Sequence, residues 1–569
     1  MLRSTFCNYS SMLALLVGLG GNVCTSPALS QRTQAPGAAL DSAAISARLH
    51  EIGAAGKLAE LHGPDFSDYR ADFQRVYQVS SFTPIWLSGG EPTPQALAVI
   101  RALEVSAQKG LKPEDYDASR WQGWISALKS PANADTDARF DAALTVDAMR
   151  YISNLHLGRV DPKHFKFGID IGQKKYNLPQ LVTQDVIHAA NVQAVLDAAE
   201  PPYAGYKRTE IALQRYLKMA ANGNGPSVPE VQKSIAPGES YGGTAQLAER
   251  LKLLGDLPQS VVADAKSDAY TGALVDAVKL FQSRHGLTPD GRLSKETIRQ
   301  LNVPLSSRVM QLQDALERWR WLPPSFPQPP VVVNVPEFVL RVFSSDQKVA
   351  LRMNVVVGKA LRHQTPVFAK DMRYIVFRPY WNVPSSILRS EIIPSVAKNR
   401  NYIANKNFEV TDYSGTIVTD GPISDAVLAQ LRAGKLTVRQ KPGPNNSLGL
   451  VKFMFPNEHS VYMHSTPAAQ LFSQSRRDFS HGCIRVQEPA QLAAYLLRNQ
   501  PPWTLEKVRA AMQSGPNNQQ VNLAKPVPVL ILYVTSVVEE DGSVHFFDDI
   551  YGHDKELQAV LAKGQPYPG

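Results

Sequence analysis

Cysteine, long apolar runs and clusters of basic residues are all scarce in this chain of 569 residues. No apolar stretch reaches the length of about 18 residues that a membrane-spanning helix requires, so we do not expect an integral membrane protein. The formal net charge is +9, but lysine and arginine are nowhere concentrated enough to predict nucleic-acid binding. We expect a solvated basic surface instead, of a kind that also suits a polymer rich in carboxylates.

The chain contains three cysteines, Cys7, Cys24 and Cys483. The first two fall in an N-terminal stretch that has Arg3, no acidic residue, an apolar core and small residues near its end. This pattern predicts a secretory signal peptide over residues 1–30 and export to the periplasm. Cys24 raises the alternative of a lipoprotein, but the Gly-Asn-Val before it is a poor match to a lipidation signal.

Cleavage of that signal would leave Cys483 as the single cysteine of an exported protein, with no disulfide partner. A lone thiol is either an inert core residue or a nucleophile. The surrounding sequence favours a nucleophile, because strand-like segments carry His464 upstream and Gly482 directly beside the cysteine. A neighbouring imidazole promotes the thiolate, and a glycine lets the backbone turn sharply and approach a substrate closely.

The pattern of His464, fifteen residues, then Ser-His-Gly-Cys-Ile-Arg over residues 480–485 resembles the signature of the L,D-transpeptidases, which have a YkuD-type catalytic domain. The best match is the large periplasmic subgroup, which joins a scaffold domain and a peptidoglycan-binding domain to the catalytic one. The resemblance implies that the cysteine forms a thioester with a peptidoglycan stem peptide and releases D-alanine. A second stem then resolves the thioester, giving a 3→3 cross-link between diaminopimelate residues. No metal or organic cofactor is implied, and carbapenems are expected to acylate the same cysteine.

Three other functions stay open at this point. Water in place of the second stem would make the protein an L,D-carboxypeptidase, and a free D-amino acid would make it an exchange enzyme. The third is a non-catalytic cell-wall-binding scaffold, which the intact pair of His464 and Cys483 disfavours. Peptidoglycan stem peptides are the expected partners, together with other cell-wall synthesis proteins.

The resemblance assigns roles to five catalytic residues. Cys483 is the nucleophile, and His464 is its base or imidazolium partner, oriented by the carbonyl of Ser465. Backbone N–H groups of Gly482 and Cys483 would form the oxyanion hole, with Tyr462 close to the acyl group.

Five further residues are expected to face the substrate. His481 is also an alternative base, because a strand residue two positions before the nucleophile faces the same side. Arg485 either attracts a substrate carboxylate or forms a structural ion pair. Trp381 and Tyr380 either wall the pocket or pack in the core, and Ser480 completes the set.

Chain length and hydrophobic periodicity predict a multidomain α+β protein. Residues 41–235 form a helical scaffold domain in this interpretation. Residues 240–305 resemble a small three-helix peptidoglycan-binding type 1 domain, with Thr244 and Ser294 as helix caps. Residues 306–328 are predicted to be a linker helix.

From residue 329 to residue 569, β-branched and alternating segments predict a mostly antiparallel β catalytic domain. Residues 387–448 are polar and too long for an ordinary connection, so they are a candidate lid. The resemblance implies that they form a capping subdomain over the active site. His156 and His164 have no third ligand at a suitable spacing, so no metal site is expected.

Overall fold

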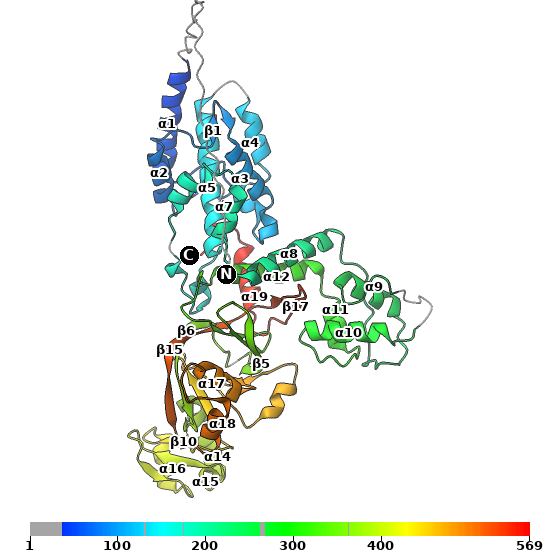
Figure 1. The fold of residues 1–569 in the computed structure, drawn as a ribbon, viewed down its shortest axis with the longest axis vertical. Helices are drawn as coiled ribbons and strands as arrows, with labels where there is room; N and C mark the ends of the chain where they lie inside the picture. The colour runs from blue at the N-terminus through cyan, green and yellow to red at the C-terminus, as the bar shows by residue number, and fades with distance from the viewer. Residues whose placement is uncertain (1–36, 130–132, 175, 262–267, 362, 569) are drawn as a thin grey trace, which may run out of the picture.

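The computed structural model describes residues 37–568 apart from 130–132, 175, 262–267 and 362. The predicted signal peptide therefore lies outside the described residues. The predicted fold class is confirmed, because a helical N-terminal part, a helical bundle and a β-rich C-terminal part make up an elongated multidomain chain (Figure 1). Among the residues described, no helix is both long enough and apolar enough to cross a membrane.

The N-terminal part is built around one long helix, α5 (Ala134–Leu157), which is buried along most of its length. Helix α1 (Gly37–Ala55) packs against it, and Ile45, Leu49 and Ile52 of α1 are buried on the predicted common face. The remaining helices around α5 are α2 (Arg70–Val79), α3 (Pro94–Glu104), α4 (Trp121–Leu128), α6 (Leu178–Gln180) and α7 (Val192–Ala199). The apolar periodicity of the sequence therefore predicted the helical character of this part correctly.

Three helices form the predicted small bundle, which lies to one side of the chain in Figure 1. They are α9 (Thr244–Leu254), α10 (Ala273–Arg284) and α11 (Lys295–Leu301). The predicted cap at Ser294 is confirmed, because its Oγ accepts the Thr297 N–H at 3.1 Å. The predicted cap at Thr244 is wrong, because α9 already begins at that residue and Gly243 holds the cap position. A threonine inside the first turn does not cap that turn.

The predicted linker helix, α12 (Leu305–Arg320), is largely buried between other parts of the chain. Arg318 of α12 donates to Asp554, and both side chains are almost fully buried. Helix α12 packs against α8 (Ala204–Ala221), α19 (His553–Leu561) and the hairpin strand β16 (Ser536–Val538). It therefore binds the N-terminal and C-terminal parts of the protein together.

The β-rich C-terminal part contains a nine-stranded sheet of order β13-β5-β14-β12-β11-β6-β15-β3-β4 within the described residues. Strand β4 also pairs with β5, so the sheet closes on itself. Most pairs are antiparallel as predicted, but β12 with β14, β13 with β5 and β15 with β3 run parallel. The strands are β3 (Val331–Asn334), β4 (Val339–Phe343), β5 (Val349–Gly358), β6 (Phe368–Phe377), β11 (Val451–Met454), β12 (Met463–His464), β13 (Asp478–Ser480), β14 (Ile484–Val486) and β15 (Gln519–Leu532).

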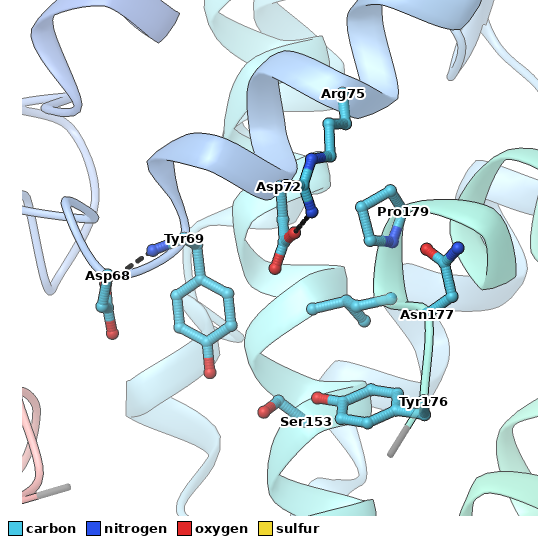
Figure 2. A pocket seen from close by; sticks show the side chains of 9 residues that line it. Asp68, Tyr69, Asp72, Arg75, Ser153, Tyr176, Asn177 and Pro179 are labelled. Atoms are coloured by element: carbon cyan, nitrogen blue, oxygen red, sulfur yellow. Dashed lines mark hydrogen bonds and ion pairs between the residues drawn. The ribbon is translucent and has the colours of Figure 1, made fainter.

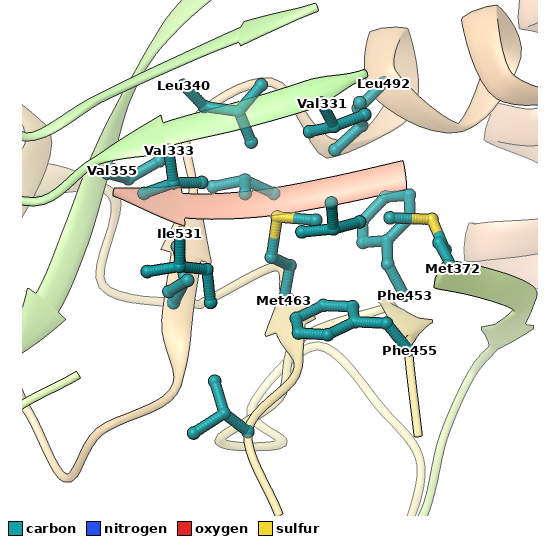
Figure 3. Packing of buried hydrophobic residues seen from close by; sticks show 14 of the residues in the cluster. Val331, Val333, Leu340, Val355, Met372, Phe453, Phe455, Met463, Leu492 and Ile531 are labelled. Atoms are coloured by element: carbon teal, nitrogen blue, oxygen red, sulfur yellow. The ribbon is translucent and has the colours of Figure 1, made fainter. Parts of the chain in front are cut away.

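Aliphatic and aromatic side chains from several of these strands fill the interior of the sheet (Figure 3). Met463 of β12, Phe453 of β11 and Ile531 of β15 are all fully buried in this core. Because successive strand residues point to opposite faces, burial of Met463 fixes the direction of its neighbours. Tyr462 and His464 therefore point away from this core.

The predicted capping subdomain is a small α/β unit with its own sheet of order β7-β10-β8-β9. Buried Val396, Val410 and Val438 give it a separate hydrophobic core, which its polar composition concealed. Its sheet begins before residue 387, because Trp381 pairs with Gln440. The elements are β7 (Trp381–Asn382), α13 (Ser385–Ile387), α14 (Ile393–Lys398), α15 (Tyr402–Asn405), β8 (Phe408–Thr411), β9 (Ile417–Thr419), α16 (Asp425–Arg432) and β10 (Thr437–Gln440).

Candidate active site

Cys483 lies in a tight turn between β13 and β14. Gly482 has a φ of 115°, a conformation that favours glycine. The Oγ of Ser480 accepts the Gly482 N–H at 3.0 Å and donates to the Cys483 carbonyl at 2.5 Å. The Oγ1 of Thr365 donates to the Gly482 carbonyl at 2.8 Å. The turn that carries the thiol is therefore held from both sides by hydroxyl groups.

Strand alternation brings the predicted catalytic residues to one face of the sheet. Ile484 of β14 pairs with the buried Met463 of β12, so Cys483 and Tyr462 both project to the opposite side. The Ile484 N–H donates to the Tyr462 carbonyl at 3.1 Å, which fixes this register. One position further on, His464 lies opposite Arg485.

His464 is a buried, neutral imidazole. Its Nδ1 is 2.6 Å from the carbonyl oxygen of Ser465, so Nδ1 carries the proton that it donates there. Burial, and next the charge of Arg485, lower the pKa of His464 to about 3. Ser465 is itself fixed, because its Oγ accepts the Leu450 N–H at 2.6 Å. The unprotonated Nε2 of His464 is therefore the nitrogen that can accept a proton.

The thiol of Cys483 is half-buried and has its Sγ 4.0 Å from the carbonyl oxygen of Ser460. Burial raises the pKa of the Cys483 thiol, while hydrogen bonds from Tyr462 oppose that rise. Burial and the neighbouring thiol raise the pKa of the Tyr462 phenol, so the phenol stays protonated and can donate. A hydrogen bond to Trp381 connects Tyr462 with the capping subdomain.

Lys452 of β11 is a site residue that the sequence analysis missed. It pairs with His464 across β11 and β12, and its Nζ lies 5.0 Å from the centroid of the Tyr462 ring. Burial lowers the pKa of Lys452, and the Cys483 thiol raises it. The available signal was a single lysine in an otherwise apolar strand just before the histidine motif.

Arg485 is the second cation at the thiol. Burial lowers the pKa of Arg485, and the Cys483 thiol raises it. Its Nε is buried and has no hydrogen-bond partner. Within the part of the chain that the structure describes, no acidic side chain forms an ion pair with Arg485. The surroundings of Arg485 therefore favour a role toward substrate over a structural ion pair.

Comparison with known proteins agrees with this arrangement. Residues 329–521 match the family model of the L,D-transpeptidase catalytic domain, and residues 71–213 match the model called Scaffold domain. Residues 241–301 match the model called "Putative peptidoglycan binding domain". The resemblance to the L,D-transpeptidases is confirmed. The chain is also 26% identical over 370 residues to a Haemophilus influenzae protein named "Putative L,D-transpeptidase", over 61% of this chain and 74% of that protein.

A residue beyond the end of the matched L,D-transpeptidase domain also helps to hold the turn that carries Cys483. Tyr551 is buried and its hydroxyl donates to the Gly358 carbonyl at 2.6 Å. The hydroxyl oxygen of Tyr551 accepts the Thr365 N–H at 3.2 Å, and the Thr365 side chain in turn donates to the Gly482 carbonyl. Tyr551 is thus a positioning residue for the nucleophile turn. Tyr551 lies far along the chain from that turn, so the sequence alone did not indicate this contact.

His481 and Tyr380 were also predicted to face the substrate, but their side chains contact other residues than those around the thiol. His481 is exposed, and its Nε2 is 2.8 Å from Oε1 of Glu391 in the capping subdomain. Tyr380 packs against Arg439, whose Cζ is 4.5 Å from the tyrosine ring centroid. Trp381, in contrast, reaches Tyr462 while also packing against Phe408.

The two histidines considered for a metal site have separate surroundings. His156 has its Nδ1 2.9 Å from the carbonyl oxygen of Ala199, and its ring packs against Tyr176. His164 packs edge-on against Phe165. Each of these histidines therefore packs as an ordinary structural residue.

Proposed function

We propose that this protein is a peptidoglycan L,D-transpeptidase that forms 3→3 cross-links between diaminopimelate residues through a thioester on Cys483. The single observation that supports the proposal is that Cys483 directly precedes β14 while the neutral His464 ends the adjacent parallel strand β12, within a matched catalytic domain. The same acyl-enzyme would also serve an L,D-carboxypeptidase or D-amino-acid exchange. The peptidoglycan-binding model matched by residues 241–301 and the cell-wall substrate both support action in the periplasm.

In the first half-reaction, Nε2 of His464 accepts the thiol proton, and the sulfur attacks the carbonyl carbon of the third stem residue. The carbonyl oxygen becomes negative and is stabilised by nearby donors. Gly482 N–H already donates to Ser480 in this structure, so it would have to exchange partners to contribute. The protonated Tyr462 phenol and the Lys452 ammonium, which both lower the pKa of the thiol, are candidate side-chain donors. The C–N bond then breaks, and the imidazolium proton goes to the amine of departing D-alanine.

In the second half-reaction, the side-chain amine of another stem's diaminopimelate attacks the thioester carbonyl. His464 takes a proton from that amine, the C–S bond breaks, and the thiolate of Cys483 regains the proton. Water in place of the amine would give a tripeptide. Exclusion of water by the capping subdomain therefore favours cross-linking.

The experiment that tests the proposal incubates the mature protein with disaccharide tetrapeptide and identifies the products by mass. We expect a cross-linked dimer that has lost one D-alanine. Tripeptide without dimer would replace the proposal by carboxypeptidase action. Unchanged substrate from protein whose thiol is intact would overturn it in favour of a wall-binding scaffold.

Replacing Lys452 by methionine should shift the pH dependence of acylation. The Lys452 charge lowers the pKa of the Cys483 thiol, so its loss moves the rise in acylation rate to higher pH. At pH 7 the rate should fall by roughly tenfold, the effect of about 1.4 kcal/mol. Because the pKa of His464 is about 3, neither protein should show a further inflection near pH 6 to 7. Stopped-flow acylation by a carbapenem measures both profiles.

A matched control for that variant is Lys370→Met. Lys370 lies on β6 of the same sheet, but its Nζ pairs with Glu458 at 3.3 Å and it is exposed. Lys370→Met should show the same pH dependence of acylation as the parent protein. Equal shifts in the two variants would contradict a specific effect of Lys452 on the thiol.

Acylation should also draw the capping subdomain toward the nucleophile turn. Two contacts connect them, Trp381 with Tyr462 and Glu391 with His481. Hydrogen exchange should therefore slow in residues 381–392 after acylation, while the buried strand β8 changes little because the subdomain has its own core. Cys483→Ala protein exposed to the same inhibitor is the control. Identical exchange before and after acylation would show a rigid part of the fold.

A further inference from the structure

The helical N-terminal part contains a polar pocket of about 570 Å³ that has no role in the proposed chemistry (Figure 2). Its walls come from the start of α2, from α5 and from the segment that leads into α6. They are formed by Asp68, Tyr69, Asp72, Arg75, Ser153, Tyr176, Asn177, Leu178 and Pro179. Most of the exposed lining is polar, so the pocket does not suit an apolar ligand.

Two tyrosines and one serine form the interior of this pocket. Burial raises the pKa of Tyr69 and of Tyr176, so both phenols keep their protons. The Ser153 hydroxyl lowers the pKa of both Tyr69 and Tyr176, and Figure 2 shows their rings on either side of it. The Tyr176 ring also packs against His156 at a centroid distance of 4.6 Å, which holds it in place. The pocket thus presents rigid aromatic surfaces together with neutral hydroxyl groups.

Carboxylates line the rim of the same pocket. Asp72 pairs with Arg75 at 3.4 Å. Among the described residues, Asp68 accepts only the N–H of the next residue, Tyr69, at 3.1 Å through Oδ1, so Oδ2 can accept a ligand hydroxyl. Both carboxylates disfavour an anionic group at this end of the pocket.

A second hollow of about 150 Å³ adjoins the first, because Asp68 and Tyr69 line both. It is lined from the other side by Arg150, Arg159 and Tyr567. Arg150 is 3% exposed, donates Nη2 to two backbone carbonyls, and has its Nη1 paired with Oδ1 of the buried Asp147 at 3.8 Å. The two hollows, which share Asp68 and Tyr69, are together called the groove; the first presents hydroxyl groups and the second guanidinium groups.

We propose that this groove binds the saccharide chain of a glycan whose sugars carry carboxyl or amide substituents. Flat aromatic rings suit the faces of pyranose rings, and carboxylate and phenol oxygens suit their hydroxyl groups. The guanidinium groups that line the second hollow suit a substituent carbonyl or carboxylate. The identification of this glycan as peptidoglycan rests on the proposed function. The groove would hold a strand at the N-terminal part of the chain while the catalytic part acts on its stem peptides.

The test uses full-length Cys483→Ala protein and peptide-free peptidoglycan glycan chains as the probe. Hydrogen exchange should slow in residues 68–75 and 176–180 when the glycan is added. Protection confined to residues 241–301 would overturn the proposal, because the small helical bundle would then account for binding. No protection in either place at saturating glycan would also overturn it.

Affinity measurements on variants make the assignment specific. Tyr176→Ala and the exposed Asp68→Asn should each weaken glycan binding at least fivefold, and Asp68→Asn carries little risk to folding. Tyr413→Ala, at a tyrosine 76% exposed in the capping subdomain, is the matched control and should not change affinity. Unchanged affinity in both groove variants would refute the site.

A separate measurement distinguishes this proposal from the proposed function. Tyr176→Ala with its thiol intact should keep the acylation rate by a carbapenem, which does not contain a glycan. Loss of acylation in that variant would mean that the pocket acts through the fold of the catalytic part. If the protein binds glycan through these residues but never forms cross-links, the glycan site is supported and the transpeptidase assignment is rejected.

Discussion

Replacement of Cys483 by alanine should abolish acylation by a carbapenem and lower cross-link formation by more than about a thousandfold. The reason is that both half-reactions pass through sulfur, and no other described cysteine is present to replace it. Intact-mass measurement should show one inhibitor adduct on the exported protein and none on the variant. An adduct that persists on Cys483→Ala would place the nucleophile elsewhere.

Cys483→Ala should fold like the parent protein, so its loss of acylation can be attributed to the missing thiol. The bonds that hold the turn involve the backbone of residues 482 and 483, with the hydroxyls of Ser480 and Thr365 as partners. Alanine keeps all of them. Thermal unfolding of the variant should therefore lie close to that of the parent, and a large drop would indicate that the thiol also has a structural role.

Loss of His464 should lower dimer and tripeptide formation together, by about 100-fold to 10,000-fold. Both products need the same proton acceptor at the thiol. His464→Asn is the preferred variant, because its amide can still donate to the Ser465 carbonyl but has no basic nitrogen. His464→Ala should give the same loss. Product analysis by mass and acylation rates measure the two steps separately.

The chain offers a matched control in His481, which belongs to the same motif but contacts Glu391. His481→Ala removes an exposed ion pair with Glu391, worth about 0 to 1 kcal/mol, and a ring contact with His363, and should leave acylation within a few-fold of the parent. The opposite pattern, with full acylation in both His464 variants and loss in His481→Ala, would make His481 the base.

The sequence predicted the thiol, the histidine and the class of fold because these depend on local signals. A motif of fixed spacing identified Cys483 and His464, and helical periodicity identified Ile45 and Leu49 as core. The parallel pairing of β12 with β14 was not predicted, because hairpin-like spacing suggested a simple antiparallel meander.

Residues that depend on distant partners escaped the sequence analysis. Tyr551 contacts Thr365 from 186 positions away along the chain, and nothing local indicates that contact. Asp141 is a similar case in α5, where a polar residue is fully buried because it accepts from the Tyr77 hydroxyl and the Trp86 N–H. In both cases, partners supplied by the tertiary fold determine what the residue does.

The position of β15 has a consequence for how the protein is made. β15 lies between β6 and β3 in the sheet, although it is the last of the nine strands to be synthesised. A nascent chain that emerges N-terminus first therefore contains Cys483 well before it contains the strand that completes the sheet. Tyr551, which supports the turn, follows later still. A chain released early from the ribosome would contain Cys483 but would lack β15 and Tyr551, so we expect that only full-length molecules can be acylated at this thiol.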